Sequence, residues 1–500
     1  MATPESQQIE AGYQRLVAAP EQLNLLDQVA ALALQAGATQ RAADIYLEFI
    51  GHHSQHAGAQ FNCGYYCRAA GYYQQAIEHY QQALALGISQ PEEVHTNIGV
   101  IYNEGLLQND AAIAAFTAAL KVKPGYVPAL YNLANCYEQN GDKVAAARYF
   151  TEVIKQAPDF AMAYVRLADV HRAEAADDPL IVKLKQLVEE PRLPLTQRID
   201  AAYALGKLFN DCQAYAEAWQ FYQQANEWNA TTMPAWDADK QRALLNTLRA
   251  EFSAPFAVSK AAADAVAEGC ESMRPVFVCG MFRSGSTLVE QMLGAHTEIV
   301  SGGELEFFPR LWRRIETQGL SGFLQQQSNA ELAQLGSDYL NFVRERLGEV
   351  SYFTDKRPDT IWLLGLIKQV LPQAKFIVTR RQPLDNALSV YFTRLGPAMS
   401  YANRFEDILA FMEMERELLA HWQTVFGDHL QVVDYDDLVV DPERELGAVL
   451  RGLGLDWQEQ CLDFHQRANS VRTASVWQVR QPLYQSSSGR WRNYQAFLPK

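Results

Sequence analysis

The stretch Val276-Phe-Val-Cys-Gly-Met-Phe-Arg-Ser-Gly-Ser-Thr-Leu288 decides the fold of the C-terminal half of this chain. Its apolar beginning, from Pro275 to Cys279, predicts a short buried strand, and a helix is expected to begin near Ser286. Between them, Gly280 and Gly285 have the spacing of a phosphate-binding loop. In such a loop, backbone N–H groups surround an anion and the next helix directs its positive end toward it.

The loop lacks the lysine that follows the second glycine in nucleotide triphosphatases, because Ser286 occupies that position. Its positive charge comes instead from Arg283, inside the loop. We therefore expect the loop to bind phosphate-like oxygens, and the group that it handles to differ from a γ-phosphate.

A second strand-to-helix turn follows further along the chain. Residues Lys375 to Thr379 predict a buried strand that leads directly into Arg380 and Arg381, and the helix after them carries a hydroxyl at Ser389. Open α/β sheets bind ligands at the carboxyl ends of their strands. This turn therefore predicts a second anion site, and two such sites suggest a ligand with phosphates at both ends. The pattern leaves open which of the two arginines contacts the anion.

A candidate general base lies between the two anion sites. Gly302 and Gly303 precede Glu304, so the backbone can bend sharply and place the carboxylate against the bound ligand, as a general base requires. An exposed loop glutamate is the alternative. Further on, Tyr352 to Pro358 precedes an expected helix from Thr360 to Val370.

The first half of the chain is rich in Ala, Leu, Gln and Tyr at helical spacing, and it repeats with a period of about 34 residues. Small residues recur where paired helices would cross, aromatic residues where they would fill grooves, and prolines where the second helix would end. The clearest copies contain Leu130, Leu133, Ala134, Tyr137, Ala146, Phe150 and Pro158, then Gly99, Tyr102, Ala112, Phe116 and Pro124, then Gly64, Ala76 and Tyr80, and then Gly206, Ala218 and Tyr222. This pattern resembles the tetratricopeptide repeat, whose helix pairs stack into a solenoid.

These patterns predict an α plus α/β protein in three parts. Residues 1–255 are expected to form an α-solenoid of tetratricopeptide repeats, residues 256–273 a weakly patterned, Ala-rich linker, and residues 274–500 a P-loop-like α/β domain with a central, mainly parallel sheet. The solenoid would offer a concave surface to a protein or peptide partner.

Composition excludes several classes of function. The formal net charge of −15 argues against a nucleic-acid-binding protein. No apolar run reaches the roughly 18 residues of a membrane span. The cysteines are scattered and odd in number, as is typical of reduced core cysteines, and no signal-peptide pattern follows Met1. We therefore expect a cytoplasmic protein.

The motifs of the second half resemble the sulfotransferases that use 3′-phosphoadenosine 5′-phosphosulfate (PAPS). The resemblance runs from about Pro275 to the C-terminus and is nearest to the protein-tyrosine branch and its bacterial relatives, and the whole chain resembles bacterial tetratricopeptide-repeat sulfotransferases. By this resemblance Arg381 and Ser389 hold the 3′-phosphate, Tyr435 lies near the nucleotide, and Arg490 belongs to a loop that closes over it. The residues similar to the family's 5′-phosphosulfate loop are Arg283, Ser284, Gly285, Ser286, Thr287 and Leu288.

The resemblance also assigns catalytic roles. It implies Glu304 as the base, Lys356 near the leaving oxygen, and Arg283 and Ser475 as further catalytic groups. The donor would be PAPS and the product 3′-phosphoadenosine 5′-phosphate (PAP). Because a sulfuryl group carries less negative charge than a terminal phosphate, no metal is expected. Positioning and charge stabilisation would then supply most of the catalysis.

The acceptor stays open at this point. Glu306 stands where the animal protein-tyrosine enzymes carry an arginine that helps to hold an acidic peptide. A peptide tyrosine, a saccharide, a lipid and a small molecule therefore all remain candidates. Two other classes also remain: a repeat-containing adaptor whose second domain binds nucleotide without catalysis and, less favoured because of Ser286, a P-loop kinase or nucleotide triphosphatase.

Overall fold

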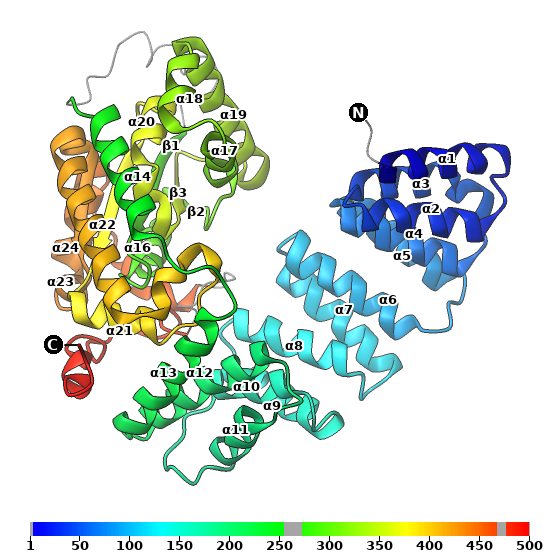
Figure 1. Ribbon diagram of the computed structural model, residues 1–500, viewed down its shortest axis with the longest axis horizontal. Helices are drawn as coiled ribbons and strands as arrows, with labels where there is room; N and C mark the ends of the chain where they lie inside the picture. Colours follow the sequence, from blue (N-terminus) through cyan, green and yellow to red (C-terminus); the bar gives the residue numbers. More distant parts are fainter. Residues whose placement is uncertain (1–3, 255–272, 468–476, 500) are drawn as a thin grey trace. The chain divides into compact units, whose positions relative to one another are not determined.

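The computed structural model describes residues 4–254, 273–467 and 477–499, and they form two compact units that divide between His171 and Arg172 (Figure 1). The first unit lies within the expected repeat region. The second contains the whole α/β domain together with the helices from residue 179 to residue 251. This division falls earlier in the chain than the end of the repeat pattern near residue 255. The expected linker, 256–273, lies almost entirely outside the described residues.

The first unit is a series of α-helices in which neighbours along the chain pack as antiparallel pairs, such as α4 with α5, α6 with α7, and α8 with α9. A 3₁₀-helix (Ile50–His53) and a π-helix (Ile101–Gly105) interrupt the series. The α-helices are α1 (Pro4–Ala18), α2 (Leu23–Gln35), α3 (Thr39–Phe49), α4 (Ala57–Ala70), α5 (Tyr73–Ala85), α6 (Pro91–Val100), α7 (Asn109–Val122), α8 (Val127–Gln139), α9 (Lys143–Gln156) and α10 (Ala161–Val170).

Close packing inside these pairs explains why small residues recur in the sequence. A Cβ atom at Gly99 of α6 would lie 2.5 Å from the ring of Phe116 on α7, and one at Gly64 of α4 would lie 2.8 Å from the ring of Tyr80 on α5. Both rings are completely buried. The helices can therefore approach this closely only where one partner lacks a side chain. The expected solenoid of paired helices is confirmed.

The second unit encloses a sheet within helices. Its strands are β1 (Arg274–Gly280), β2 (Ile299–Ser301), β3 (Tyr352–Lys356), β4 (Lys375–Arg380) and β5 (Leu430–Asp434). Its α-helices are α11 (Pro179–Glu189), α12 (Leu195–Asp211), α13 (Tyr215–Ala230), α14 (Ala238–Glu251), α16 (Ser286–Leu293), α17 (Phe307–Glu316), α18 (Leu320–Gln326), α19 (Asn329–Leu347), α20 (Leu364–Val370), α21 (Pro383–Tyr391), α22 (Phe405–Phe426), α23 (Tyr435–Leu438) and α24 (Pro442–Leu453). Its 3₁₀-helices are Pro358–Trp362, Pro397–Asn403, Gly427–His429, Glu459–Gln466 and Arg490–Tyr494.

The five strands form one parallel sheet in the order β2-β3-β1-β4-β5. The expected central, mainly parallel sheet is thus confirmed. In the view of Figure 1, α17, α18 and α19 lie to one side of the strands and α22 and α24 to the other. The central strand β1 is buried on both faces, which accounts for its continuous apolar sequence. Since the chain passes from β3 on one side of β1 to β4 on the other, the order reverses between β1 and β4. Ligands of open α/β sheets bind at such a switch point.

Two strands and one helix differ from expectation. The sequence pattern did not reveal β3 or β5. In β3 the charged residues Asp355 and Lys356 are both buried, so the strand does not read as an apolar run. The helix expected over 360–370 is divided into a 3₁₀-helix, Pro358–Trp362, and α20, Leu364–Val370. Within the described ranges no helix has the length and apolar character needed to cross a membrane.

Candidate active site

The carboxyl ends of all five strands meet at one edge of the sheet, and each carries a residue that the sequence analysis selected. Parallel pairing places Val278 of β1 beside Lys356 of β3, and Gly280 of β1 beside Thr379 of β4. The segments that follow β1, β2, β4 and β5 carry, in that order, Arg283, Glu304, Arg381 and Tyr435, and β3 itself ends at Lys356.

The loop after β1 has the backbone that a phosphate-binding loop needs. Gly280 has a φ of +131°, and a Cβ atom there would lie 2.2 Å from the carbonyl oxygen of Thr379. Gly285 has a φ of +108°, and Arg283, at +67°, adopts the left-handed conformation although it is not glycine. Asn386 of α21 braces the loop by donating from Nδ2 to the carbonyl oxygen of Phe282 at 2.8 Å. The surrounding structure thus holds the loop in a conformation that costs backbone strain.

A pocket lies beside this loop, at the switch point of the sheet. The C-terminal segment from Gln478 to Arg490 forms its opposite wall. Most of the predicted nucleotide-binding residues line it: Arg283, Gly285, Thr287, Leu288, Arg381, Ser389, Tyr435 and Arg490.

Two predicted residues do not line the pocket, and a third cannot be compared. Ser284 is completely buried, and its hydroxyl lies 2.7 Å from Oγ1 of Thr379, so it fastens the loop to β4 instead of lining the pocket. Ser286 is also buried and is not among the residues that line the pocket. Ser475 lies outside the described residues.

The pocket concentrates positive charge. Burial, together with the nearby charges of Arg381 and Arg490, lowers the pKa of Arg283 to about 10. Arg283 donates hydrogen bonds from Nε to Ser389 Oγ at 3.1 Å and from Nη2 to Gln478 Oε1 at 2.7 Å. These partners are neutral, so the arginines are close together without a carboxylate among the residues that line the pocket. Such a site favours a multiply charged anion.

The structure distinguishes the two arginines that follow β4. Arg381 lines the pocket, its guanidinium lies 4.7 Å from the centre of the Tyr435 ring, and its Nη2 donates to the carbonyl oxygen of Ser487 at 2.6 Å. Its Nε atom is buried without a hydrogen-bond partner among the described residues. Arg380 is exposed and pairs with Asp434 at 3.0 Å. Arg381 is therefore the one placed to bind an anion in the pocket.

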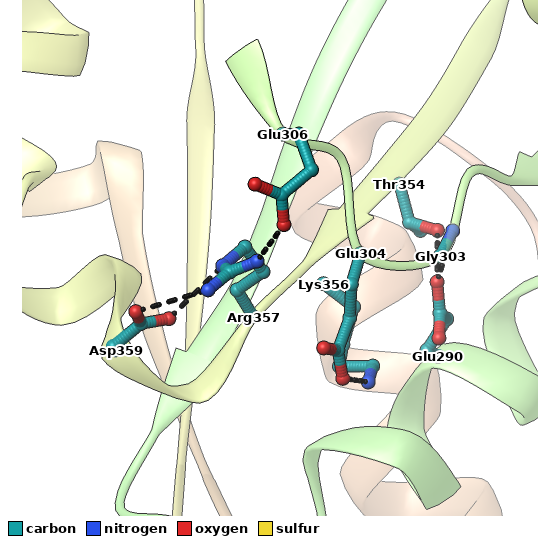
Figure 2. A network of polar contacts seen from close by, with 8 residues as sticks. All are labelled: Glu290, Gly303, Glu304, Glu306, Thr354, Lys356, Arg357 and Asp359. Carbon is teal, nitrogen blue, oxygen red and sulfur yellow. Dashed lines mark hydrogen bonds and ion pairs between the residues drawn. The ribbon is translucent and has the colours of Figure 1, made fainter. Parts of the chain in front are cut away.

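Figure 2 shows the candidate base and Lys356 pointing toward each other. Lys356 Nζ lies 2.5 Å from Glu304 Oε1. The lysine side chain is 2% exposed, whereas that of the glutamate is 41% exposed. The backbone N–H of Lys356 also donates to the carbonyl oxygen of Gly303 at 2.8 Å, which ties the loop after β2 to the end of β3. A buried cation beside an accessible carboxylate suits a site where an acceptor hydroxyl enters from solvent.

Glu290 of α16 positions this loop, and the sequence analysis did not single it out. Its Oε1 accepts hydrogen bonds from the backbone N–H of Gly303 at 2.9 Å and from Thr354 Oγ1 at 3.1 Å (Figure 2). Glu290 is almost completely buried, and this burial raises its pKa. The available signal was a carboxylate among the apolar residues Leu288, Val289, Met292 and Leu293 of a short helix.

A second ion-pair group lies near the base. Arg357 donates from Nη1 to Glu306 Oε1 at 2.7 Å and from Nε to Asp359 Oδ1 at 3.1 Å (Figure 2). Glu306 also lies 3.7 Å from Arg313 of α17. The Glu306 carboxylate is therefore engaged with two cations of this chain.

Two buried or half-buried carboxylates fasten the C-terminal wall of the pocket. Asp385 of α21 accepts hydrogen bonds from the backbone N–H groups of Gly489 at 2.6 Å and Trp491 at 2.7 Å. Asp436, next to Tyr435, accepts a hydrogen bond from Ser488 Oγ. Sequence reasoning missed these contacts because each joins residues that are far apart in the chain. Among the described residues, no group of three or more His, Cys, Asp or Glu side chains is arranged to hold a metal ion.

Comparisons with known proteins show which families the two parts of the chain match. Residues 275–459 match the model of the sulfotransferase family, and residues 30–91 and 105–160 match that of the tetratricopeptide repeat. The chain is 27% identical over 387 residues to an uncharacterized protein of Aquifex aeolicus, covering 75% of this chain and 50% of that protein. It is 25% identical over 286 residues to protein-tyrosine sulfotransferase 1 of Danio rerio, covering 51% of this chain and 74% of that enzyme.

Among solved structures, the sulfotransferase domain of the Synechococcus PCC 7002 olefin synthase is 23% identical, covers 45% of this chain and 89% of that chain, and has a TM-score of 0.35. From the matches to the two family models, this chain joins tetratricopeptide repeats to a domain of the sulfotransferase family. The resemblance inferred from the motifs is thereby confirmed.

Proposed function

We propose that this protein transfers a sulfuryl group from PAPS to an acceptor hydroxyl. The observation that carries the proposal is the convergence of Arg283, Arg381 and Arg490 on one pocket at the switch point of the sheet. The match to the sulfotransferase family and the distant similarity to protein-tyrosine sulfotransferases support the same reaction.

The chemistry of the pocket fits a nucleotide with separate 3′ and 5′ anionic groups. The loop after β1 and the beginning of α16 offer glycine backbone and the Thr287 hydroxyl for one group. Arg381 and Ser389 offer a guanidinium and a hydroxyl for the other. The buried Nε of Arg381, which lacks a partner among the described residues, is the kind of donor that a bound phosphate would satisfy.

PAPS, when bound, supplies a sulfuryl group attached through a bridging oxygen to phosphate. Glu304 would accept the proton of the acceptor hydroxyl while the acceptor oxygen bonds to sulfur and the bond from sulfur to the bridging oxygen breaks. Lys356 would stabilise the negative charge that develops on the departing phosphate oxygen. The products are the sulfated acceptor and PAP, and the proton stays on the Glu304 carboxyl until solvent removes it.

We further propose a peptide or protein acceptor, recruited by the repeats, in the cytoplasm. Several of the relatives are named protein-tyrosine sulfotransferases, which supports a tyrosine hydroxyl. The ion pairs of Glu306 with Arg357 and Arg313 make the region near the base less cationic than a site for an acidic peptide would be. An acceptor sequence without dense acidic residues is therefore favoured.

Two measurements test the function. Isothermal titration of the full-length protein with PAP tests the donor site, and a protein that gives no binding heat at millimolar PAP would contradict the proposal. Incubation with sulfur-35-labelled PAPS and a cell lysate, followed by identification of the labelled species, tests transfer and identifies the acceptor. PAP binding with no labelled species in any fraction would instead support a nucleotide-binding adaptor.

A further inference from the structure

Helix α12 contacts Arg490, a residue that lines the pocket, through the side chain of Asn210. The Oδ1 atom of Asn210 accepts a hydrogen bond from Arg490 Nη2 at 3.0 Å and another from the Tyr494 hydroxyl at 2.7 Å. Arg490 lines the pocket, whereas Asn210 does not. A residue from the region of the repeat pattern therefore holds one of the three arginines of the candidate donor site.

Helix α13 braces the neighbouring wall of the same pocket. Asn226 donates from Nδ2 to the carbonyl oxygen of Tyr391, the last residue of α21, at 2.8 Å. The ring of Tyr222 stacks on that of Phe392, with the ring centres 3.9 Å apart. Helix α21 also carries Ser389, which lines the pocket. Helices α12 and α13 together therefore contact two segments of the pocket wall, the C-terminal segment with Arg490 and the end of α21.

The orientation of Arg490 depends on these contacts. Its guanidinium lies 5.0 Å from the centre of the Phe392 ring, and the hydrogen bond to Asn210 fixes the direction in which the Nη2 atom points. In an empty pocket the positive charges of Arg283 and Arg381 repel that of Arg490. Without an acceptor at residue 210, the long arginine side chain would gain rotamer freedom and turn toward solvent, so that the anion would have to order it on binding.

We propose that Asn210 is a positioning residue for the nucleotide pocket: it orients Arg490 for anion binding. Helices α12 and α13 would then contribute to the affinity of the donor site. The proposal rests on the proposed function, since PAP is the ligand that reports on it. A hydrogen bond to a charged group is worth enough for its loss to weaken PAP binding by about tenfold.

The test is a double-mutant cycle on the full-length chain, with PAP affinity measured by isothermal titration. Asn210→Ala is expected to raise the Kd by about tenfold in the otherwise unchanged protein, and by less than about twofold when Arg490→Ala is already present. In an Arg381→Ala background, where one of the two repelling charges is gone, the Asn210→Ala effect should be smaller than in the unmodified protein but larger than in the Arg490→Ala background. Asn246→Ala, at an exposed position of α14, is the matched control and should leave the Kd unchanged.

A purely structural role for Asn210 predicts a different result. It would lower the melting temperature and weaken PAP binding equally in all backgrounds, which would overturn the proposal. An unchanged Kd for Asn210→Ala would overturn it as well. If the alanine variant does not fold, Asn210→Gln, which displaces the acceptor oxygen by one methylene group, gives the same test. Failure of the unmodified protein to bind PAP would contradict the proposed function itself, so the two failures are distinguishable.

Discussion

Arg283 Nε donates a hydrogen bond to Ser389 Oγ at 3.1 Å, although the two residues are 106 positions apart in the chain. Arg283 comes from the loop after β1, and Ser389 comes from the helix after β4. The sequence showed these as two separate anion motifs. Their contact makes them two sides of one pocket.

The two arginines after β4 should differ in their effect on PAP binding. Arg381→Ala is expected to raise the PAP Kd at least about tenfold, because a half-buried guanidinium inside the pocket is lost. Arg380→Ala is the matched control and should change the Kd by less than about twofold, since its exposed pair with Asp434 contributes little. Isothermal titration of both variants measures the difference, and a larger effect at Arg380 would refute the assignment.

The base should matter for transfer but not for donor binding. Glu304→Gln keeps an oxygen beside Lys356 but cannot accept a proton, so kcat should fall by about 10²-fold or more while the PAP Kd stays within about threefold. Labelled-sulfate transfer and PAP titration measure the two quantities. Glu316→Gln, near the end of α17, is the control. Full activity of Glu304→Gln would remove this residue from the mechanism.

The loop after β1 should tolerate no side chain at residue 280. Gly280→Ala places a methyl group against the carbonyl oxygen of Thr379 in a backbone conformation with positive φ, and should lower the free energy of unfolding by about 3 kcal/mol. Gly454→Ala also has positive φ, in the left-handed helical region, but open space around its Cβ, so about 1 kcal/mol is expected there. Chemical denaturation compares the two, and equal losses would show that steric contact with β4 is unimportant.

A buried acid in β3 should make stability depend on pH. Burial raises the pKa of Asp355 to about 7 from its ordinary value of 3.8, against a hydrogen bond from the Tyr339 hydroxyl at 3.0 Å. Between these two pKa values the folded protein holds a proton that the unfolded chain has released. The free energy of unfolding contributed by this group therefore falls as pH rises from about 4 to 7.

The check is chemical denaturation of the unmodified protein and Asp355→Asn across that pH range. The asparagine mimics the neutral acid, so the variant should lose this part of the pH dependence. The free energy of unfolding of the variant, minus that of the unmodified protein, should therefore increase from pH 4 to pH 7. Asp338→Asn, at an exposed position of α19, should keep the original slope. Parallel pH profiles for the unmodified protein and Asp355→Asn would show that Asp355 titrates normally in the folded state.

Much of the candidate site could be predicted because its signals are local. The spacing from Gly280 to Gly285 with Arg283 inside it, and the pair formed by Arg381 and Ser389, each lie within one strand-to-helix turn. Backbone conformation and helix direction over such short stretches depend on neighbouring residues. The same holds for the repeats, where Gly99 and Phe116 are set by packing inside a single helix pair.

The sequence by itself therefore determined the α plus α/β class, the position of the glycine-containing loop after β1 and most residues that line the pocket. Only the tertiary structure decided that Arg381 and not Arg380 faces the pocket, that Glu290 holds the loop of the base, and that Asn210 holds Arg490. It also decided that Asp355 and Lys356 belong to a buried strand. These outcomes depend on single contacts between segments that are distant in the chain, and such contacts leave no periodicity or spacing in the sequence.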